Sequence, residues 1–311
     1  METKKPKVSI IMLNYNTEDY TIQALESMKG TDYDNYEIIL VDNGSNENSI
    51  KKLKKSLGKY KKVIYKEISP NRGVGGGFKA GVPEASNPDY ILFINNDIKI
   101  TQNNWLNTFI ETAKNNVGIV GCKLLYPDGT LQHAGGKINF LKPHFTMHIG
   151  IHDNPEKEIY NKVIDVDYVT GAAMLIKTEI IKQLNGFEDL FLPMYYEDSD
   201  FCIRAKKLGY TIKYTHRVRI IHFESPTTKK ATSAYFTYVT TKNKILFLLL
   251  NMPLRYIPIR TIYEFFSMIK WVLRGQGKSY FKAVLWNIKN LNLIIKKRNE
   301  RKELHMGFVA N

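Results

Sequence analysis

Acidic side chains gather in residues 186–210, which read GFEDLFLPMYYEDSDFCIRAKKLGY. Five carboxylates stand there among aromatic residues, and Glu197, Asp198 and Asp200 open a predicted helix over 197–208. A carboxylate at a helix N-terminus stays ionised at neutral pH, and apolar neighbours can raise its basicity, so it can serve as a general base. Acids at a helix start can also be simple partners of the helix dipole. That role explains one or two of them, but less easily a cluster flanked by aromatic rings.

A second candidate site is the end of LFINND, residues 92–97, where Asn95, Asn96 and Asp97 follow an apolar run. Asp97 is placed to bind a hard divalent cation, because such an ion needs only one or two protein carboxylates when substrate phosphates complete its shell. His222, which ends the apolar run of RIIHFESP, could be a second ligand. The alternatives are a turn capped by Asx side chains and a purely structural histidine.

Two further stretches could hold a ligand. In IILVDNGSNENS, Asp42 follows an apolar run and can accept hydrogen bonds from a ribose hydroxyl or a base N–H, although it could equally cap the next helix. In SPNRGVGGGFKAG, three consecutive glycines allow a ligand to approach the backbone and a helix N-terminus. This is not the dinucleotide fingerprint, because Phe78 stands where the third glycine should be.

The apolar pattern predicts the elements that must position these groups. Strands buried on both faces appear as short, nearly continuous apolar runs, and such runs occur at 8–13, 37–41, 63–65 and 90–94. Helix-like stretches separate them, at 18–28, 48–57 and 75–85. The alternation predicts an α/β fold with a mostly parallel central sheet and flanking helices. Ligands of such sheets bind beyond the carboxyl ends of the strands, where Asn14, Asp42 and Asp97 fall.

Later segments complete this part of the chain. Residues 133–152 are rich in glycine and histidine and predict a loop or hairpin on the substrate side. A strand is expected at 172–176, and an apolar run at 220–223 ends the globular part. We therefore assign residues 1–228 to one domain and residues 229–311 to a C-terminal region.

The C-terminal region is strongly basic. It holds 16 lysines and arginines against three acids, whereas the rest of the chain holds 29 against 27. Apolar residues at helical spacing form two stripes among these cations, which predicts basic amphipathic helices. The first stripe comprises Ile262, Phe265, Phe266, Ile269, Val272 and Leu273, and the second Phe281, Val284, Leu285, Ile288, Leu291 and Ile295.

These helices are expected to lie on a membrane. The most apolar segment, ILFLLLNMPL, has ten residues, too few for the roughly 20 that span a bilayer. The alternative is helices that pack on the catalytic domain or on a second subunit, which makes a homodimer possible. A nucleic-acid partner is not expected, because the aromatic residues of the region mostly fall in the amphipathic stripes.

Cysteine usage and the N-terminus bear on the compartment. Cys122 and Cys202 have neither CxxC nor metal-ligand spacing, so a disulfide framework and a zinc site are not indicated. The start METKKPKVSIIML has too short an apolar run for a signal peptide. We expect a cytoplasmic protein that is peripheral on the inner face of the cell membrane.

Seven stretches in this order resemble the family 2 inverting glycosyltransferases, which have the GT-A fold, and especially their bacterial rhamnosyltransferase-like branch. They are VSIIMLNYNTEDYTIQALESM, EIILVDNGSNENS, NRGVGGGFKAG, YILFINND, VTGAAMLIK, GFEDLFLPMYYEDSDFCIRAKKLGY and IIHFES, which together span about residues 7–225. Each stretch alone is a weak signal, whereas seven in the right order are specific.

The resemblance implies a role for each candidate residue. A nucleotide-diphospho-sugar donor would contact Asn14, Asp42, Asn43, Arg72, Gly73, Gly75, Asn95 and Asn96. A divalent cation, Mg²⁺ or Mn²⁺, would be held by Asp97 and His222. Asp97 matches the last position of the family's DXD-type motif, whose first position is Asn95 here. Asp198 aligns with the catalytic base and Glu197 stands beside it. Asp200 and Tyr196 would orient the acceptor or cap the helix.

The implied reaction transfers a sugar to a hydroxyl of a lipid-linked or growing cell-surface polysaccharide. Rhamnose from dTDP-rhamnose is the first choice and a UDP-sugar the second. A single displacement would invert the anomeric centre, with the cation neutralising the leaving diphosphate. The alternatives are a non-catalytic nucleotide-sugar or membrane-binding protein and a sugar nucleotidyltransferase. The last is disfavoured, because NYNTEDY follows the first strand where a glycine-rich loop with Arg or Lys is expected.

Overall fold

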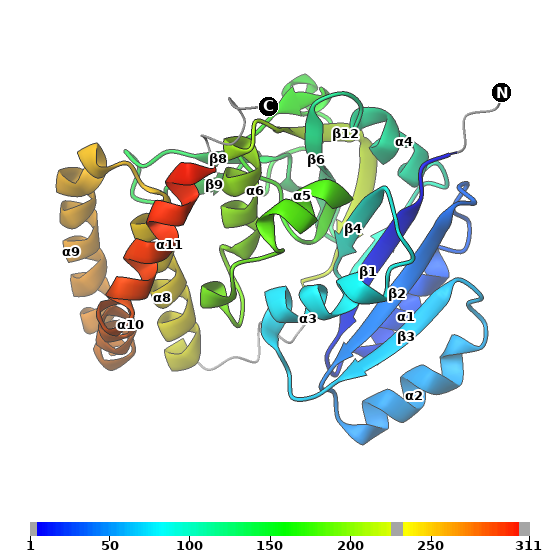
Figure 1. Ribbon diagram of the computed structural model, residues 1–311, viewed down its shortest axis with the longest axis horizontal. Helices are drawn as coiled ribbons and strands as arrows, with labels where there is room; N and C mark the ends of the chain where they lie inside the picture. The colour runs from blue at the N-terminus through cyan, green and yellow to red at the C-terminus, as the bar shows by residue number, and fades with distance from the viewer. Residues whose placement is uncertain (1–4, 225–232, 305–311) are drawn as a thin grey trace.

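A ten-stranded mixed sheet with helices on both faces forms the centre of the molecule in the computed structural model, which describes residues 5–224 and 233–304 (Figure 1). Its first half is parallel, in the spatial order β3–β2–β1–β4. These strands are β1 (Val8–Asn14), β2 (Tyr36–Asn43), β3 (Val63–Ile68) and β4 (Tyr90–Ile94). The four predicted strands are confirmed.

The second half of the sheet contains a strand, β11 (Ala173–Lys177), that runs antiparallel to both of its neighbours. These neighbours are β4 and β6 (Val117–Leu125), and β12 (Thr211–His222) is parallel to β6. The short strands β5 (Ile98–Ile100) and β10 (Ile164–Asp165) pair with β12, and β7 (Leu131–His133) pairs with β6. The predicted hairpin is confirmed as β8 (Gly136–Ile138) and β9 (Thr146–His148).

Helices cover the sheet in two layers, each with its own apolar core. On one face lie α1 (Glu18–Ser27), α2 (Glu47–Leu57) and α4 (Trp105–Thr112). On the other lie α3 (Gly73–Gly81), α5 (Thr178–Leu184) and α6 (Glu197–Lys207). Single turns of 3-10 helix occur at Val82–Glu84, Glu158–Tyr160, Asp189–Phe191 and Leu254–Tyr256. The strands are apolar on both sides because both sides are covered.

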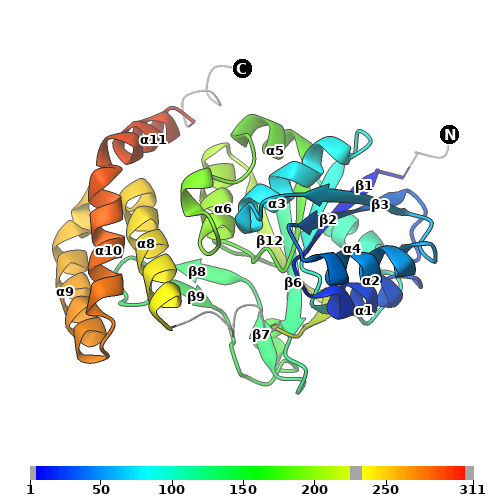
Figure 2. The ribbon, with the colours of Figure 1, turned by 90° about the horizontal axis from the view of Figure 1, so that it is seen from below.

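The C-terminal helices form a bundle at one end of the molecule (Figure 2). They are α8 (Ser233–Asn251), α9 (Ile257–Leu273), α10 (Gly277–Lys289) and α11 (Leu291–Glu303). Their buried residues Phe247 and Ile294 share a third apolar core with Phe145 of the β8–β9 connection and Phe191 of the segment before α6. The bundle therefore packs on the part of the chain that contains the central sheet. The predicted domain boundary at 228 falls outside the described residues.

The predicted apolar stripes are helical but face outward. Phe265, Phe266 and Leu273 of α9 are 55%, 62% and 82% exposed, and Phe281 of α10 is 52% exposed. The side of α10 that is buried carries Tyr280, Ala283 and Asn287 instead. Among the described helices, none is both long and apolar enough to cross a membrane.

Candidate active site

The parallel strands β1, β2 and β4 end at one edge of the sheet, where hydrogen bonds link side chains at or just beyond the strand ends. Asn14 Nδ2 donates to Asp42 Oδ2 at 2.8 Å. Thr21 Oγ1 of α1 donates to Asn14 Oδ1 at 2.8 Å and accepts from Asn96 Nδ2 at 2.7 Å. This strand-end network of Asn14, Thr21, Asp42 and Asn96 holds together the carboxyl ends of the strands, where ligands of α/β sheets bind.

The network also engages the predicted donor contacts of this group. Asn14 has no exposed surface, and its amide uses both its nitrogen and its oxygen within the protein. Asn96 is 8% exposed and its nitrogen is bound by Thr17 and Thr21. Asp42 is 1% exposed, and its Oδ1 also accepts from Ser45 N at 2.8 Å. These side chains therefore hold neighbouring elements in place, and their contact with a donor stays a prediction.

Asn43 shapes the glycine-rich loop from the end of β2. Its Nδ2 donates to Gly73 O and its Oδ1 accepts from Arg72 N, both at 2.9 Å. The Arg72 side chain is exposed next to this turn. Asn43 thus uses its side chain on the backbone, which leaves Arg72 as the group free to reach an anionic ligand.

The glycines of this loop allow close contacts within the protein itself, and their contact with a ligand stays a prediction. Gly73 has a φ of +69°, and a Cβ there would lie 2.5 Å from Pro193 O. Val74 N donates to the same oxygen at 2.7 Å. A Cβ on Gly75 would lie 3.2 Å from Cβ of Phe187. The start of α3 therefore rests directly on residues 187–193, the segment that leads to the acidic cluster.

Strand pairing brings the two predicted metal ligands together. β5 follows Asp97 and pairs with the end of β12, so that His222 lies opposite Ile98. His222 Nε2 is 3.2 Å from Asp97 Oδ1 and 3.2 Å from Asn95 Nδ2, and His222 Nδ1 is 2.8 Å from Gln132 Oε1.

The imidazole faces three polar groups. Its Nδ1 faces the Gln132 oxygen, and its Nε2 faces both the Asn95 amide and the Asp97 carboxylate. The Asp97 carboxylate and the imidazole therefore lie side by side. This donor set fits Mn²⁺ or Mg²⁺, with other positions left for phosphate or water oxygens. Among the described residues, no group of three or more His, Cys, Asp or Glu is arranged to hold a metal alone.

Asp198 lies at the same sheet edge and is fixed by three hydrogen bonds. Its Oδ2 accepts from Gly171 N at 3.1 Å, and its Oδ1 accepts from Ser199 N at 2.6 Å and from Ser199 Oγ at 3.1 Å. Gly171 stands just before β11, whose Ala173 pairs with Ile94 at the end of β4. Burial raises the pKa of Asp198, and the hydrogen bonds from Gly171 and Ser199 oppose that rise.

Glu197 stands next to Asp198, and both residues are half-buried, but its environment is different. Its Oε2 is buried and makes no hydrogen bond with any described residue. Burial of this carboxyl group, followed by the negative charge of Asp198, raises the pKa of Glu197 to about 8. At neutral pH Glu197 therefore holds a proton. A fixed carboxylate beside a neutral acid is suited to general-base chemistry.

Asp200 is not an acceptor or capping residue, which corrects the prediction. It is fully buried and accepts hydrogen bonds from Arg204 Nε at 2.9 Å, Arg301 and Asn251 Nδ2 at 2.8 Å. Although burial opposes ionisation, the charges of Arg301 and Arg204 hold the pKa of Asp200 below its usual value. Asp200 therefore ties α6 to α11.

Tyr196 also has a packing role. It occupies the position before α6 with a φ of +72°, but its side chain makes no capping hydrogen bond. Its ring lies 5.9 Å from that of Phe145 and 5.3 Å from that of Phe247, measured between centroids. These contacts place the ring in the apolar core shared with the C-terminal helices, so we withdraw its assignment to the acceptor or to capping.

Two groups of residues near this site were not predicted individually. The first is His148 on β9, which lies near Asp198 and whose ring is 4.7 Å from that of His133. The histidine-rich composition of residues 133–152 was the available signal. The second is Lys242 and Asn243 of α8, which bind the segment before α6. Nothing in the sequence around them points to that contact.

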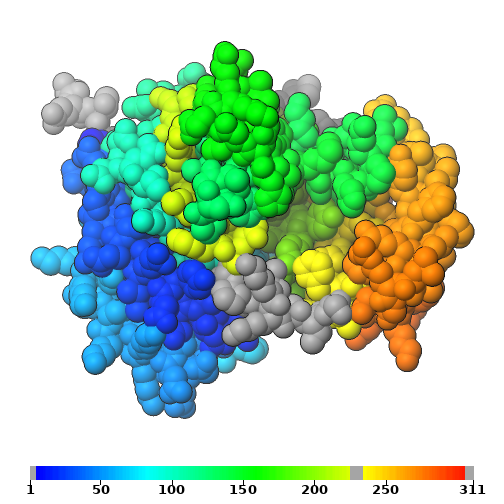
Figure 3. Space-filling view, turned by 180° about the vertical axis from the view of Figure 1, so that it is seen from behind, coloured from blue at the N-terminus to red at the C-terminus, as the bar shows by residue number. Residues whose placement is uncertain are grey.

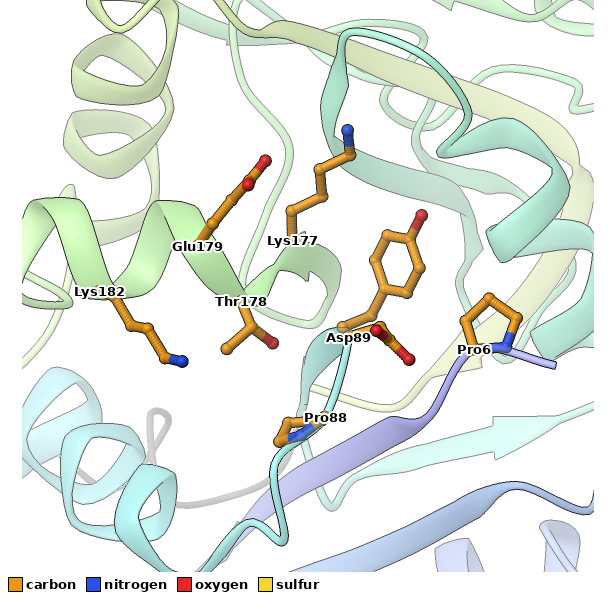
Figure 4. A pocket seen from close by; sticks show the side chains of 8 residues that line it. Pro6, Pro88, Asp89, Lys177, Thr178, Glu179 and Lys182 are labelled. Carbon is orange, nitrogen blue, oxygen red and sulfur yellow. The ribbon is translucent and has the colours of Figure 1, made fainter. Parts of the chain in front are cut away.

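A separate open cavity of about 510 Å³ lies near the start of β1 and β4, at the opposite edge of the sheet (Figure 4). Its lining consists of Pro6, Pro88, Asp89, Tyr90, Lys177, Thr178, Glu179 and Lys182. None of the predicted site residues is among them. The candidate active site is therefore the edge that carries Asp42, Asp97 and Asp198.

The mixed sheet and its flanking helices define a fold of the GT-A type. Residues 9–184 match the profile of Glycosyl transferase family 2, which is more than half of the chain. The chain belongs to this family. One of its curated relatives is a hexosyltransferase by name.

Three curated relatives act on glycans according to their names. The chain is 28% identical over 233 residues to the O-antigen biosynthesis protein RfbC of Myxococcus xanthus, with 71% of the chain and 17% of RfbC covered. It is 23% identical over 259 residues to the low-salt glycan biosynthesis hexosyltransferase Agl10 of Haloferax volcanii, covering 79% and 76%. It is 26% identical over 227 residues to the rhamnosyltransferase WbbL of Escherichia coli, covering 70% and 83%.

The relatives differ greatly in length from this chain. The match spans 17% of RfbC and 25% of the uncharacterized protein y4gI of Sinorhizobium fredii, to which the chain is 28% identical. These relatives therefore contain much that the chain does not match.

Solved structures show the same fold at low sequence identity. The mannosyltransferase PcManGT of Pyrobaculum calidifontis, in complex with GDP-Man and Mn²⁺, aligns with 99% of this chain and 88% of its own at a TM-score of 0.57 and 13% identity. GalNAc-T7 with UDP, GalNAc and Mn²⁺ aligns with 84% of this chain and 55% of its own at a TM-score of 0.59 and 13% identity. The GT-A prediction is confirmed.

Proposed function

We propose that the protein is an inverting glycosyltransferase of cell-surface glycan synthesis, with Asp198 as its general base. The observation that supports this most strongly is that Asp198 and the Asp97–His222 pair lie at one edge of the sheet, linked through the end of β4 and the start of β11. A base and a site for a diphosphate-bound cation are the two parts that a single displacement requires.

In the proposed reaction, Asp198 takes the proton from an acceptor hydroxyl as that oxygen attacks the anomeric carbon of the donor. The bond from this carbon to the diphosphate breaks on the opposite face, so the configuration inverts. Glu197 stays protonated, so that it adds no second negative charge beside the base. Asp42 and the exposed Arg72 are the proposed contacts for the nucleoside and the diphosphate. Asn95, whose amide binds the His222 ring, is proposed to hold that ring in place.

Asp97 and His222 are the proposed cation ligands. A bound Mn²⁺ or Mg²⁺ supplies charge neutralisation for the diphosphate that leaves. The two solved neighbours that contain Mn²⁺ together with a nucleotide or nucleotide sugar support this proposal. The hydrogen bond between His222 Nδ1 and Gln132 orients the ring for that role.

The relatives and the outward-facing stripes guide the choice of donor and acceptor to test. The name of WbbL supports dTDP-rhamnose as the first donor to test, and the GDP- and UDP-containing structures require other nucleotides to be included. A lipid-linked or growing polysaccharide acceptor fits the outward-facing apolar stripes of α9 and α10, because such an acceptor is held at a membrane.

The donor site can be tested by thermal stability with dTDP-, UDP-, GDP- and CMP-sugars, each with and without Mn²⁺ or Mg²⁺. A ligand at about 100 times its Kd stabilises the folded state by roughly 2.7 kcal/mol. We expect one nucleotide class to stabilise the wild type only with metal. Asp97→Ala should lose this stabilisation and Asp198→Asn should keep it. The Asp198→Asn variant should also lose about 10²–10⁴-fold in transfer rate, the usual contribution of a general base.

The outcomes separate the two sites. Stabilisation that survives in Asp97→Ala would remove Asp97 from the donor site. Full transfer activity in Asp198→Asn would remove Asp198 as the base. If no sugar nucleotide stabilises the wild type with either metal, the proposed function is wrong.

A further inference from the structure

Residues 190–196 form the loop that leads into α6, the catalytic helix, which carries Asp198. Two side chains of α8 hold this loop. Lys242 Nζ donates to Leu190 O at 3.0 Å and to Leu192 O at 2.6 Å. Asn243 Nδ2 donates to three more carbonyl oxygens, those of Phe191, Met194 and Tyr195. Five carbonyl groups of this short loop thus bind one turn of a helix from the C-terminal bundle.

Both side chains are buried, so these bonds cannot be exchanged for water without a large rearrangement. Lys242 is 5% exposed and Asn243 has no exposed surface. The Lys242 ammonium also lies 4.5 Å from the centre of the Trp286 ring of α10. Burying an ammonium and an amide is unfavourable unless their donors are satisfied. If the loop moved away, the donors of both side chains would lose these partners.

The backbone at the end of the loop needs such support. Tyr195 and Tyr196 have φ values of +77° and +72°, which side chains other than glycine rarely adopt. A backbone in this region persists only where its surroundings fix it. Asn243 donates to the carbonyl oxygens of Met194 and Tyr195, which belong to the peptide groups that precede Tyr195 and Tyr196. Glu197 and Asp198 follow at once.

We propose that Lys242 and Asn243 are positioning residues for the catalytic base. By fixing residues 190–196 they determine where α6 begins, and thereby where the Asp198 carboxylate stands relative to the donor. This inference rests on the proposed function, in which Asp198 is the base. The C-terminal bundle is then part of the catalytic apparatus in addition to any role in membrane binding.

The test uses the full chain with three substitutions and one matched control. Asn243→Ala removes three bonds to the loop, Lys242→Met removes the ammonium but keeps an unbranched chain, and Lys242→Arg keeps charge and donors. Asn287→Ala is the control. Asn287 of α10 is also buried and donates to the backbone of Lys242 and Ala283, so its loss loosens the same helix packing without touching the loop.

We expect kcat of Asn243→Ala and Lys242→Met to fall about 10–100-fold with the donor KM nearly unchanged, because small displacements of a catalytic group have effects of this size. Lys242→Arg should recover most of the activity, and Asn287→Ala should keep the wild-type kcat per folded molecule. If Asn287→Ala lowers kcat as much as Asn243→Ala, the two residues only stabilise the fold and the proposal is wrong.

Hydrogen exchange of the backbone amides provides a readout that does not need activity. In Asn243→Ala the amides of residues 190–200 should exchange faster than in Asn287→Ala. Unchanged exchange there would overturn the proposal even if activity fell. If the wild type transfers no sugar from any donor, the proposed function fails, while the exchange rates still decide whether α8 holds the loop.

Discussion

At the scale of single residues, the adjacent acids Glu197 and Asp198 differ in the hydrogen bonds that their carboxyl groups accept. Neighbouring carboxylates in a buried place do not both ionise at neutral pH. Asp198 has three hydrogen bonds that favour its charge, whereas Glu197 Oε2 has none with a described residue. The sequence identified both acids by their aromatic neighbours. It could not show which of them keeps the proton, because that depends on Gly171, which is distant along the chain.

The proton on Glu197 makes stability depend on pH. The pKa of Glu197 is raised to about 8 in the folded state, so between about pH 4.5 and 8 the folded state binds a proton that the unfolded state has lost. The stability that this group contributes is complete below about pH 4.5 and is lost as the pH rises through 8. Glu197→Gln lacks this dependence. The free energy of unfolding of the wild type, minus that of Glu197→Gln, should therefore decrease from pH 5 to pH 8.

Urea unfolding at pH 5, 6, 7 and 8 measures this difference. The exposed Glu47→Gln on α2 is the control, for which the difference should not fall over this range. Glu197→Gln should also keep transfer activity at pH 7, because glutamine resembles the protonated acid. A difference that is constant from pH 5 to 8 would mean that Glu197 is ionised in the folded protein.

At the scale of elements, a buried ion pair attaches the catalytic helix to the C-terminal bundle. Arg301 of α11 binds Asp200 of α6, and the two side chains are 4% and 0% exposed. Breaking a buried pair by removing one partner typically costs about 3–5 kcal/mol, because it leaves an uncompensated charge. We expect Arg301→Met to lower the free energy of unfolding by roughly this amount.

The neighbouring Lys302→Met is the control, since Lys302 is exposed, and it should change stability by less than about 0.5 kcal/mol. Both variants can be compared by urea unfolding at pH 7. Arg204 and Asn251 still bind Asp200 in Arg301→Met. If its stability equals that of the control, these two partners suffice and the pair does not join the helices.

Elements with uninterrupted apolar patterns were predicted well, and those that depend on distant contacts were not. Strands β1 to β4 were visible because both of their faces are covered. β6 was missed because glycines interrupt VGIVGCKLL, and they are there because neighbours approach closely. A Cβ on Gly118 would lie 2.4 Å from Ile180 Cδ1, and one on Gly121 2.5 Å from Val169 Cβ. Asp200 was misassigned for a similar reason, since its partner Arg301 is 101 residues away.

At the scale of the whole molecule, the C-terminal bundle has an outer surface that the monomer leaves uncovered. Figure 3 shows the surface of α9 at the rim of the molecule, beside the β8–β9 connection. Arg260 of α9 donates to Lys142 O at 2.7 Å in that connection, so the bundle holds it in place. α9 and α10 expose phenylalanine and leucine on this bundle, and an exposed apolar patch of this kind marks an interaction surface.

The charges around this surface favour an anionic lipid bilayer as its partner. Between residues 257 and 289 the sequence has one acid, Glu264, against six lysines and arginines. Glu264 is itself bound by Lys244 and by Arg260 at 2.9 Å. A basic helix pair with outward apolar side chains is suited to lie in the lipid interface, where apolar burial and attraction to anionic headgroups act together.

Vesicle binding tests this orientation. The wild type should bind vesicles that contain anionic phospholipid more tightly than zwitterionic ones, and less tightly as salt rises. Replacing Phe265 and Phe266 together by serine should weaken binding at least about tenfold, because burial of each ring contributes about 1.5–3 kcal/mol. The matched control replaces Ile151 and Ile159, which are 49% and 63% exposed on the catalytic part, and should bind as the wild type does. Absence of vesicle binding, together with a dimer in light scattering that the Phe265 and Phe266 changes dissociate, would assign the surface to a second copy of the chain.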